Sequence, residues 1–205
     1  ADDSLLPVSR QRKFRALVPI MYGCNNFCTY CIVPFTRGRE RSRDFNQVVA
    51  ELKDLASKGY KEVMLLGQNV NSYGMEEGSD KTFPDLLRAA AEIEGFSRVR
   101  FMTSHPKNLS DEVIDIMASY KNLETHLHLP VQSGSDAVLS RMNRHYNREQ
   151  YLRTAMLFRD RLPEGSISTD IIVGFPGETE QDFEDTLSLV KTVAYDSAFT
   201  FQYSP

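Results

Sequence analysis

The sequence predicts an α/β fold in which repeated strand–helix units form a parallel sheet. Short apolar runs rich in branched residues alternate with longer stretches that carry apolar residues at helical spacing. The chain has 205 residues, 41% hydrophobic and 25% charged, which is typical of one soluble domain with a sizeable core. Six strands joined by five helical crossovers give either an open doubly wound sheet or an arc of a barrel, and periodicity is compatible with both.

Each expected helix has an identifiable start or stop. The first has Val48, Leu52 and Leu55 on one face and stops at Gly59, a residue type that tolerates a left-handed cap. Ser110 can cap a helix, Asn147 with Gln150 resembles a capping box, and Thr179 precedes an acid-rich first turn. The expected strands are residues 15–21, 62–66, 98–103, 125–129, 168–173 and 198–203.

The strand order also predicts where ligands bind. In either architecture the loops that follow the strands gather at one edge, and every candidate motif in this sequence follows a strand. No internal repeat or linker divides the chain, so we expect a lead-in from an upstream domain over residues 1–14 and one core domain over residues 15–205. Apolar runs fall far short of the roughly 20 residues that cross a bilayer, and the N-terminus lacks a signal-peptide pattern. We therefore expect a cytoplasmic protein without a membrane span.

Three cysteines, Cys24, Cys28 and Cys31, lie in the segment CNNFCTYC directly after the first strand. A disulfide would leave one of the three thiols unpaired and close only a very short loop, so ligation of a metal by the thiolates is the better interpretation. Cysteine thiolates are the usual ligands of iron–sulfur clusters, and three on one loop can hold a cluster while leaving one metal corner open. The remaining alternatives are incidental cysteines, or a zinc site completed by a distant histidine such as His105, His126, His128 or His145.

Charge is unevenly distributed along the chain. The formal net charge of −4 argues against a protein that coats nucleic acid without specificity. Residues 36–43, TRGRERSR, nevertheless carry four arginines against one glutamate. Guanidinium groups match phosphates bidentately, so these arginines can clamp a phosphate backbone beside the cysteine loop, or pair with the protein's own acids. They are Arg37, Arg39, Arg41 and Arg43.

The C-x3-C-x2-C spacing, with Tyr30 before the last cysteine, resembles the radical S-adenosylmethionine superfamily. The resemblance implies an incomplete (β/α)6 barrel. It implies a [4Fe-4S] cluster held by the three cysteines, whose open iron chelates S-adenosylmethionine and whose electron cleaves it to a 5'-deoxyadenosyl radical. A flavodoxin or ferredoxin is the implied electron donor.

The same resemblance extends to the strand ends. It implies that Gly67 and Gln68 approach the methionine amino group and that Ser104 makes a polar contact. It also assigns Gln132 and Arg144 to the ribose and the methionine carboxylate, Asp170 to a ribose hydroxyl, and the backbone from Val173 onward to the adenine. Taken alone, Gly67 can be a turn glycine, Arg144 a surface charge and Asp170 a cap.

The segments VPFTRGRERSR and LLGQNVNSYG are similar to the methylthiotransferases of this superfamily. They are closest to tRNA enzymes that add a methylthio group to carbon 2 of isopentenyladenosine beside the anticodon, which implies the tRNA anticodon stem-loop as partner. The alternatives are methylthiotransferases acting on a ribosomal-protein aspartate or on threonylcarbamoyl-adenosine, or, from another class, a non-catalytic iron–sulfur electron carrier or zinc module. The resembled enzymes hold a second [4Fe-4S] cluster in an N-terminal domain, and all three cysteines here belong to one loop. We therefore expect this chain to be the radical core only.

Overall fold

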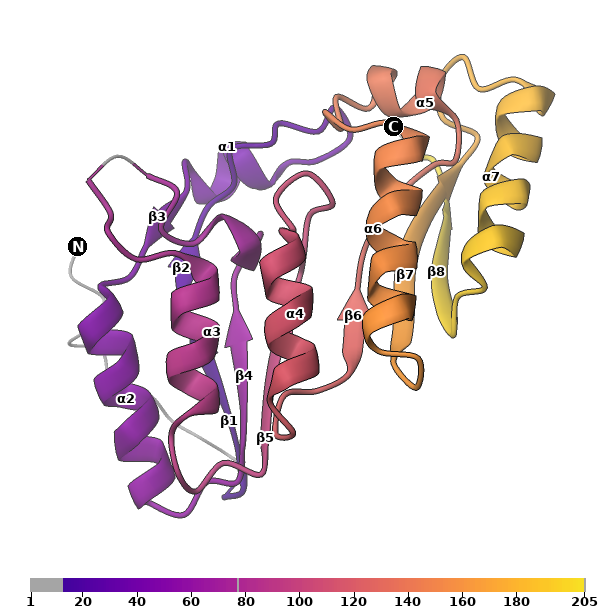
Figure 1. The fold of residues 1–205 in the computed structure, drawn as a ribbon. Coiled ribbons are helices and arrows are strands. Elements are labelled where there is room, and N and C mark those ends of the chain that lie inside the picture. Colours follow the sequence, from indigo (N-terminus) through magenta and orange to yellow (C-terminus); the bar gives the residue numbers. More distant parts are fainter. Residues whose placement is uncertain (1–12, 77, 205) are drawn as a thin grey trace.

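The computed structural model describes residues 13–76 and 78–204 (Figure 1). Most of the lead-in expected over residues 1–14 lies outside these residues. Strands and helices alternate along the described chain, and the helices lie on one side of the strands. No helix in the described part is both long and apolar enough to cross a bilayer.

Six parallel strands follow one another in space in the order of the chain. β1, β4 and β5 form one three-stranded group, and β6, β7 and β8 form a second. A bridge between Val99 and Leu123 joins the two groups, so the strands make an open arc. An incomplete barrel is therefore confirmed, and the six predicted strands are all present. Their bounds are β1 Arg15–Pro19, β4 Glu62–Leu66, β5 Arg98–Met102, β6 His126–His128, β7 Ser166–Val173 and β8 Ser197–Gln202.

The core lies between the outer face of the arc and the helices that cover it. Alternation along β1 sends Ala16 and Val18 toward the helices, whereas Leu17 faces the concave side and is 46% exposed. Leu65 of β4, also on the outer face, is fully buried. Burial of such apolar side chains is the main stabilising contribution to the domain. The covering helices are α2 Phe45–Ser57, α3 Phe83–Ala91, α4 Asp111–Ser119, α6 Arg148–Arg161 and α7 Glu180–Val193.

The expected helix starts are present in the structure. Asn147 and Gln150 form a capping box at α6, and Thr179 with Asp182 forms another at α7. Asp44, for which the sequence pattern predicts no cap, caps α2. Ser110 occupies the N-cap position of α4, although its side chain makes no capping hydrogen bond.

Short elements at the carboxyl edge of the arc differ from the predicted pattern. The first predicted strand, 15–21, is interrupted at Ile20, and its end pairs antiparallel with β3. These pieces are too short to show a hydrophobic period, which is why the sequence pattern missed them. They are β2 Met21–Tyr22, α1 Val33–Arg37, β3 Arg41–Ser42, the 3-10 turn η2 Val70–Ser72 and α5 Asp136–Arg141. β2 directly precedes the cysteine loop, and α1 directly follows it.

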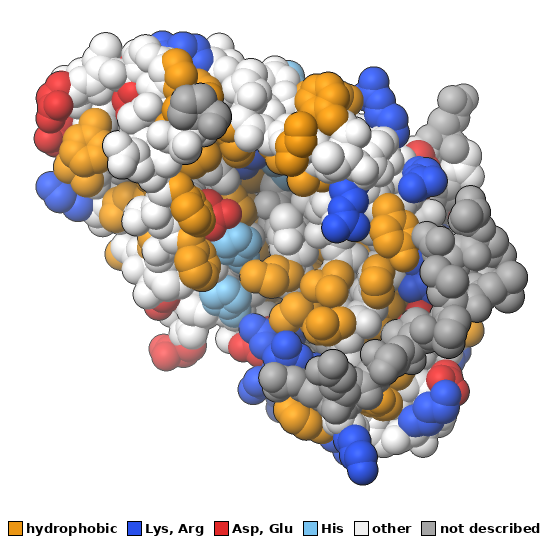
Figure 2. Space-filling model, turned by 180° about the vertical axis from the view of Figure 1, so that it is seen from behind, with side chains coloured by type: hydrophobic (Ala, Val, Ile, Leu, Met, Phe, Trp, Pro, Cys, Tyr) orange, Lys and Arg blue, Asp and Glu red, His pale blue; other side chains and the backbone are white. Residues whose placement is uncertain are grey.

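The concave face of the arc carries a layer of charged side chains near the amino ends of the strands. Glu62 lies 3.8 Å from Arg15 and 3.5 Å from Arg100. Glu124 lies 3.0 Å from Arg98. Figure 2 views the molecule from behind and shows polar and apolar side chains interleaved on this side. The concave face is therefore not a second hydrophobic core.

Truncation of a leucine to alanine should destabilise the protein by different amounts on the two faces of the arc. Leu65→Ala should destabilise the protein by about 2–5 kcal/mol, because it leaves a cavity under the helix layer. Leu17→Ala, one strand away on the concave face, should cost about 1 kcal/mol or less. Urea unfolding of both variants followed by circular dichroism measures the difference, and equal losses would contradict the assignment of the core to the outer face.

Candidate functional site

A cavity of about 340 Å³ lies at the carboxyl edge of the arc, where the predicted motifs meet. Ten of the predicted site residues line it, and they come from the cysteine loop, from the segments that follow β4, β5 and β6, and from within β7. Val173 and the four arginines of residues 36–43 do not line it. The lining includes Cys24, Cys28, Tyr30, Cys31, Gly67, Gln68, Ser104, Gln132, Arg144 and Asp170.

The cysteine loop is attached to three neighbouring segments. In the segment after α1, the Gly38 carbonyl accepts a hydrogen bond from Cys24 N at 3.2 Å. In the second segment, Gln68 Oε1 accepts from Gly23 N at 2.8 Å. In the third, Asn143 Nδ2 donates to the Phe27 carbonyl at 3.0 Å. These bonds satisfy backbone groups that a loop would otherwise leave to water, so the loop has a defined shape.

Gly23 could not be replaced without moving this loop. Its φ is 78°, and a Cβ at this position would lie 2.1 Å from the Arg39 carbonyl oxygen. The glycine before the first cysteine thus permits the close approach of the chain before β3.

Arg144 is 4% exposed and lies under the cysteine loop. Its Nη1 donates to Cys28 Sγ and to Tyr30 Oη, both at 3.3 Å. Its Nη2 donates to the Pro130 carbonyl at 2.9 Å, and its Nε donates to Tyr146 Oη at 3.0 Å. These bonds use four of the five guanidinium N–H groups.

The environment of Arg144 keeps its guanidinium protonated. Burial alone lowers the pKa of a guanidinium, but the oxygens of Tyr146 and Tyr30 and the sulfur of Cys28 raise the pKa of Arg144 above its usual value. The pKa of Tyr30 is also raised, chiefly by burial, so its phenol stays protonated. Burial likewise raises the pKa of the Cys24 thiol.

Two buried polar atoms at the cavity have no hydrogen-bond partner within the described residues. They are Ser104 Oγ and His105 Nε2, and their residues are 4% and 5% exposed. His105 Nδ1 accepts from Lys107 N at 3.3 Å, so the ring proton is on Nε2. Burial, followed by the Arg144 charge, lowers the pKa of His105 to about 2. His105 is therefore a neutral donor at pH 7, and unpaired buried donors of this kind call for a polar ligand.

The backbone at two strand ends adopts the left-handed region. Thr103 has a φ of 74° and Gln132 a φ of 72°, and both line the cavity. For a β-branched residue this conformation is strained, and strained residues cluster at functional sites. At Gln132 the turn is fixed by the backbone, because its N–H donates to the Asp170 carbonyl at 2.8 Å.

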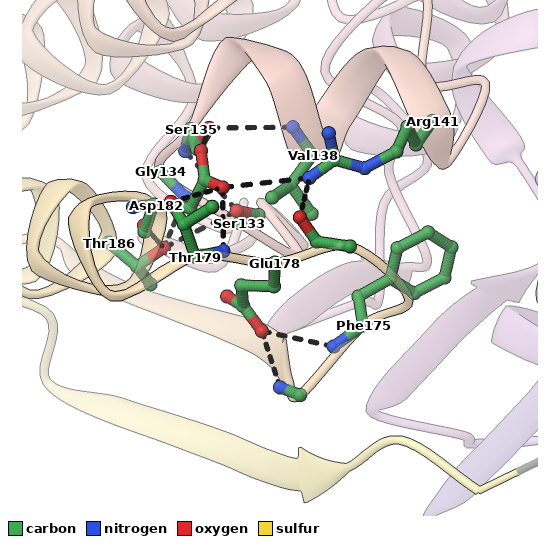
Figure 3. A network of polar contacts seen from close by, with 12 residues as sticks. Ser133, Gly134, Ser135, Val138, Arg141, Phe175, Glu178, Thr179, Asp182 and Thr186 are labelled. Atoms are coloured by element: carbon green, nitrogen blue, oxygen red, sulfur yellow. Dashed lines mark hydrogen bonds and ion pairs between the residues drawn. The ribbon is translucent and has the colours of Figure 1, made fainter.

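A buried polar network fixes the segment between Gln132 and Arg144 (Figure 3). Ser135 Oγ donates to the Asp182 carboxylate of α7, and Gly134 N donates to Thr186 Oγ1 at 2.9 Å. A Cβ at Gly134 would lie 2.6 Å from the Asp185 carbonyl oxygen, so only glycine permits this approach to α7. The short helix α5 then places Arg144 under the cysteine loop.

The same network holds the loop that follows β7. The Glu178 carboxylate accepts from the backbone N–H groups of Gly174 and Phe175, as Figure 3 shows. Phe175 packs in a small apolar cluster with Val138 and Met142, against which Tyr30 also packs. The carbonyl of Val173 accepts from Tyr203 N at 2.8 Å.

The four arginines of residues 36–43 have different environments. Arg37 is exposed at the end of α1, and Arg41 is exposed on β3. The Arg39 guanidinium lies 4.6 Å from the centre of the Phe27 ring. Arg43 is bound within the fold, because it donates to the Pro19 carbonyl at 2.7 Å and lies 2.9 Å from Glu51.

The donor set at the cavity fits an iron–sulfur cluster with a polar organic ligand. In the described residues, no three His, Cys, Asp or Glu side chains form a site for one metal ion. A cubane cluster takes each cysteine to a different iron, so its ligands surround the cluster instead of converging on one point. The cysteine loop, the buried cation and the unpaired donors of Ser104 and His105 suit a carboxylate-bearing ligand beside it.

Comparison with known proteins gives the same assignment of the fold. The family profile described as the radical SAM superfamily matches residues 18–190. The chain is 60% identical over 199 residues to tRNA-2-methylthio-N(6)-dimethylallyladenosine synthase of Clostridium botulinum strain Hall, covering 97% of this chain and 44% of that protein. It is 58% identical over 199 residues to the enzyme of the same name from Clostridium tetani, with the same coverage. The chain spans less than half the length of these relatives.

Solved structures with low sequence identity share the fold. A radical S-adenosylmethionine methyltransferase from Kitasatospora setae, with tryptophan and an S-adenosylmethionine analogue bound, matches with a TM-score of 0.72 at 19% identity, over 92% of this chain and 36% of that one. Coproporphyrinogen III oxidase from Escherichia coli matches with a TM-score of 0.64 at 18% identity, over 94% and 44%.

The network at Asp182 predicts a pH-dependent stability. Its hydrogen bonds from Ser135 and Thr179 lower the pKa of Asp182 to about 2, against about 3.9 in an unfolded chain. The stabilisation is therefore present above about pH 4 and is lost as the pH falls toward 2. Asp182→Asn should lower the melting temperature at pH 7, and the difference from wild type should shrink below about pH 4. Asp160→Asn, a change at an exposed carboxylate, is the control; a gap for Asp182→Asn that stays constant down to pH 2 would contradict the assignment.

Proposed function

This chain belongs to the radical S-adenosylmethionine superfamily, and from that membership we propose that it is the radical core of a tRNA methylthiotransferase. The observation that carries the proposal is the cavity, which gathers three cysteines of one loop with polar groups from β7 and from the segments that follow β4, β5 and β6. The choice of reaction rests on the name of the clostridial relatives and on their identity of 58–60%. The proposed product carries a methylthio group on carbon 2 of isopentenyladenosine beside the anticodon.

Cys24, Cys28 and Cys31 are the proposed ligands of a [4Fe-4S] cluster. Three thiolates leave one iron without a protein ligand, which is the position for S-adenosylmethionine. The cluster and S-adenosylmethionine, when bound, supply one-electron reductive cleavage of a carbon–sulfur bond. The loop bonds to Gly38, Gln68 and Asn143 support this role, because ligands held in place need no reorganisation when the cluster assembles.

The remaining lining residues are proposed to hold S-adenosylmethionine. Arg144 has one guanidinium N–H beyond its four internal bonds and can donate it, with Ser104, to the methionine carboxylate. Gln132 and Asp170 supply acceptors for the ribose hydroxyls. We further assign Gly67 and Gln68 to the methionine amino end and Tyr30 to packing beside the cluster. The backbone of Val173, which is outside the lining, is the proposed neighbour of the adenine.

Arg37, Arg39 and Arg41 are the proposed contacts to the tRNA anticodon stem-loop. They are exposed in the segment that begins with α1, two residues after the last cysteine, and phosphate oxygens are their natural ligands. Arg43 is better explained as part of the fold, given its bonds to Pro19 and Glu51.

The chain has no cysteine outside its loop, so a sulfur-donating second [4Fe-4S] cluster would need ligands from beyond these 205 residues. We further propose a flavodoxin or ferredoxin as electron donor. A cytoplasmic location completes the proposal, because cysteines that serve as thiolate ligands suit a reducing compartment.

The cluster and its chemistry can be tested together. Anaerobic reconstitution with iron and sulfide should give about four irons per chain. Under a strong reductant the protein should convert S-adenosylmethionine slowly to 5'-deoxyadenosine, without methylthio-adenosine in added isopentenylated tRNA. Cys28→Ala should lose both the cluster and the product, and Thr36→Ala on the neighbouring α1 should keep both. About one iron per chain would contradict the proposed cluster, and methylthiolated tRNA from this chain alone would contradict the need for a second, sulfur-donating cluster.

The arginine segment predicts a change in salt dependence. Arg37→Gln with Arg39→Gln should weaken binding of an isopentenylated anticodon stem-loop and lower the slope of log affinity against log salt by roughly one unit per lost contact. S-adenosylmethionine binding should persist. The matched control is Arg153→Gln with Arg161→Gln, which neutralises two exposed arginines on α6. An equal change of slope in the control would show that only net charge matters.

A further inference from the structure

A line of hydrogen-bonding side chains runs along the concave face of β6 and β7 and reaches the cavity at Asp170. The parallel register sets His126 beside Ser166 and His128 beside Ser168. His126 Nδ1 lies 2.8 Å from Ser166 Oγ, and His126 Nε2 lies 3.0 Å from Ser168 Oγ. Figure 2 shows histidine side chains in pale blue next to a carboxylate in red on this face.

The line continues to the carboxylate. His128 Nδ1 lies 2.9 Å from Ser168 Oγ, and His128 Nε2 lies 3.5 Å from Asp170 Oδ2. Alternate residues of a strand share one face, so Ser166, Ser168 and Asp170 project to the same side. The line therefore climbs about 13 Å along the strand, from its amino end to the cavity.

The hydrogen-bonding roles along this line follow from its end at a carboxylate. Asp170 only accepts, so the His128 tautomer that suits this contact has its proton on Nε2, and its Nδ1 then accepts from the Ser168 hydroxyl. Ser168 then accepts from His126 Nε2–H, and His126 Nδ1 accepts from Ser166. Burial and the charge of Arg100 lower the pKa of His126, in keeping with a neutral ring. The hydrogen bonds from Ser166 to His128 thus all run toward Asp170, and bonds that point the same way strengthen one another. The last step, from His128 Nε2 to Asp170 Oδ2, is a polar contact of 3.5 Å.

We infer that His128, supported by Ser168 and His126, is a positioning residue that orients the Asp170 carboxylate for a ribose diol. With Oδ2 facing His128, Asp170 Oδ1 is left to accept from a ligand hydroxyl. Asp170 lines the cavity and its side chain is 26% exposed, so an unsupported carboxylate could turn toward solvent. Phe199 contacts the His128 ring edge to face, with ring centres 6.4 Å apart, and limits its rotation. The inference rests on the proposed function, because it needs a ribose-bearing ligand in the cavity.

A double-mutant cycle on S-adenosylmethionine binding tests this role. In cluster-reconstituted protein, Asp170→Ala should weaken binding about 10-fold or more, and His128→Phe about 3- to 10-fold. In the Asp170→Ala background His128→Phe should change nothing further, because the carboxylate it orients is gone. His128→Gln, which keeps an amide donor near the Nε2 position, should recover part of the loss.

Ser168→Ala should weaken binding about 2-fold, whereas Ser197→Ala should not. Ser197 is the register partner of Ser168 on β8 and is outside the line, so it is the matched control. Cluster absorbance and melting temperature are recorded for each variant, and if His128→Phe does not fold, His128→Gln and Ser168→Ala in both backgrounds decide. Additive losses in the cycle would overturn the positioning role while leaving the proposed function intact. Wild-type protein that carries its cluster but binds no S-adenosylmethionine would overturn the proposed function itself.

Discussion

The burial of Arg144 against the cysteine loop is the interaction on which the rest of the site depends. A guanidinium that is 4% exposed is stable only when its N–H groups are hydrogen-bonded. Here the partners are Cys28 Sγ, two tyrosine oxygens and a strand-end carbonyl. The same side chain therefore joins the cysteine loop to the end of the β6 segment, and it can be buried only because the network behind Ser135 and Gly134 fixes the chain that leads to it.

The outer face of the arc carries the apolar core that stabilises the fold, and the concave face carries the polar groups of the candidate site. Side chains on the outer face pack under the helices and form the apolar core. The concave face carries ion pairs near the amino ends of the strands, the serine–histidine line in the middle and the cavity at the carboxyl end. Because alternate residues of a strand point to opposite faces, substitutions on the concave face can change ligand binding without disturbing the helix layer. This separation is what allows the positioning of Asp170 to be tested in folded protein.

The sequence predicted much of this site because its signals are local. The cysteine spacing, the glycines and the polar residues after each strand are read within a few positions, and parallel strands bring such residues to one edge. The sequence pattern suggests His105 only as a distant zinc ligand, yet it lines the cavity beside Ser104. The short elements β3 and α1 escaped prediction because they lack a period. The line from Ser166 to Asp170 could not be predicted either, because it depends on the register between β6 and β7. That register cannot be inferred from the sequence of either strand alone.

The central claim is that three cysteines hold a cluster with one iron open to S-adenosylmethionine. Electron paramagnetic resonance of the reduced, reconstituted protein tests it most directly, because a ligand that binds the open iron changes the electronic structure of the whole cluster. The account predicts a [4Fe-4S]⁺ signal whose g-values shift on addition of S-adenosylmethionine, with a weaker shift at the same concentration in Arg144→Ala. A cluster signal that is identical with and without saturating S-adenosylmethionine would contradict the account.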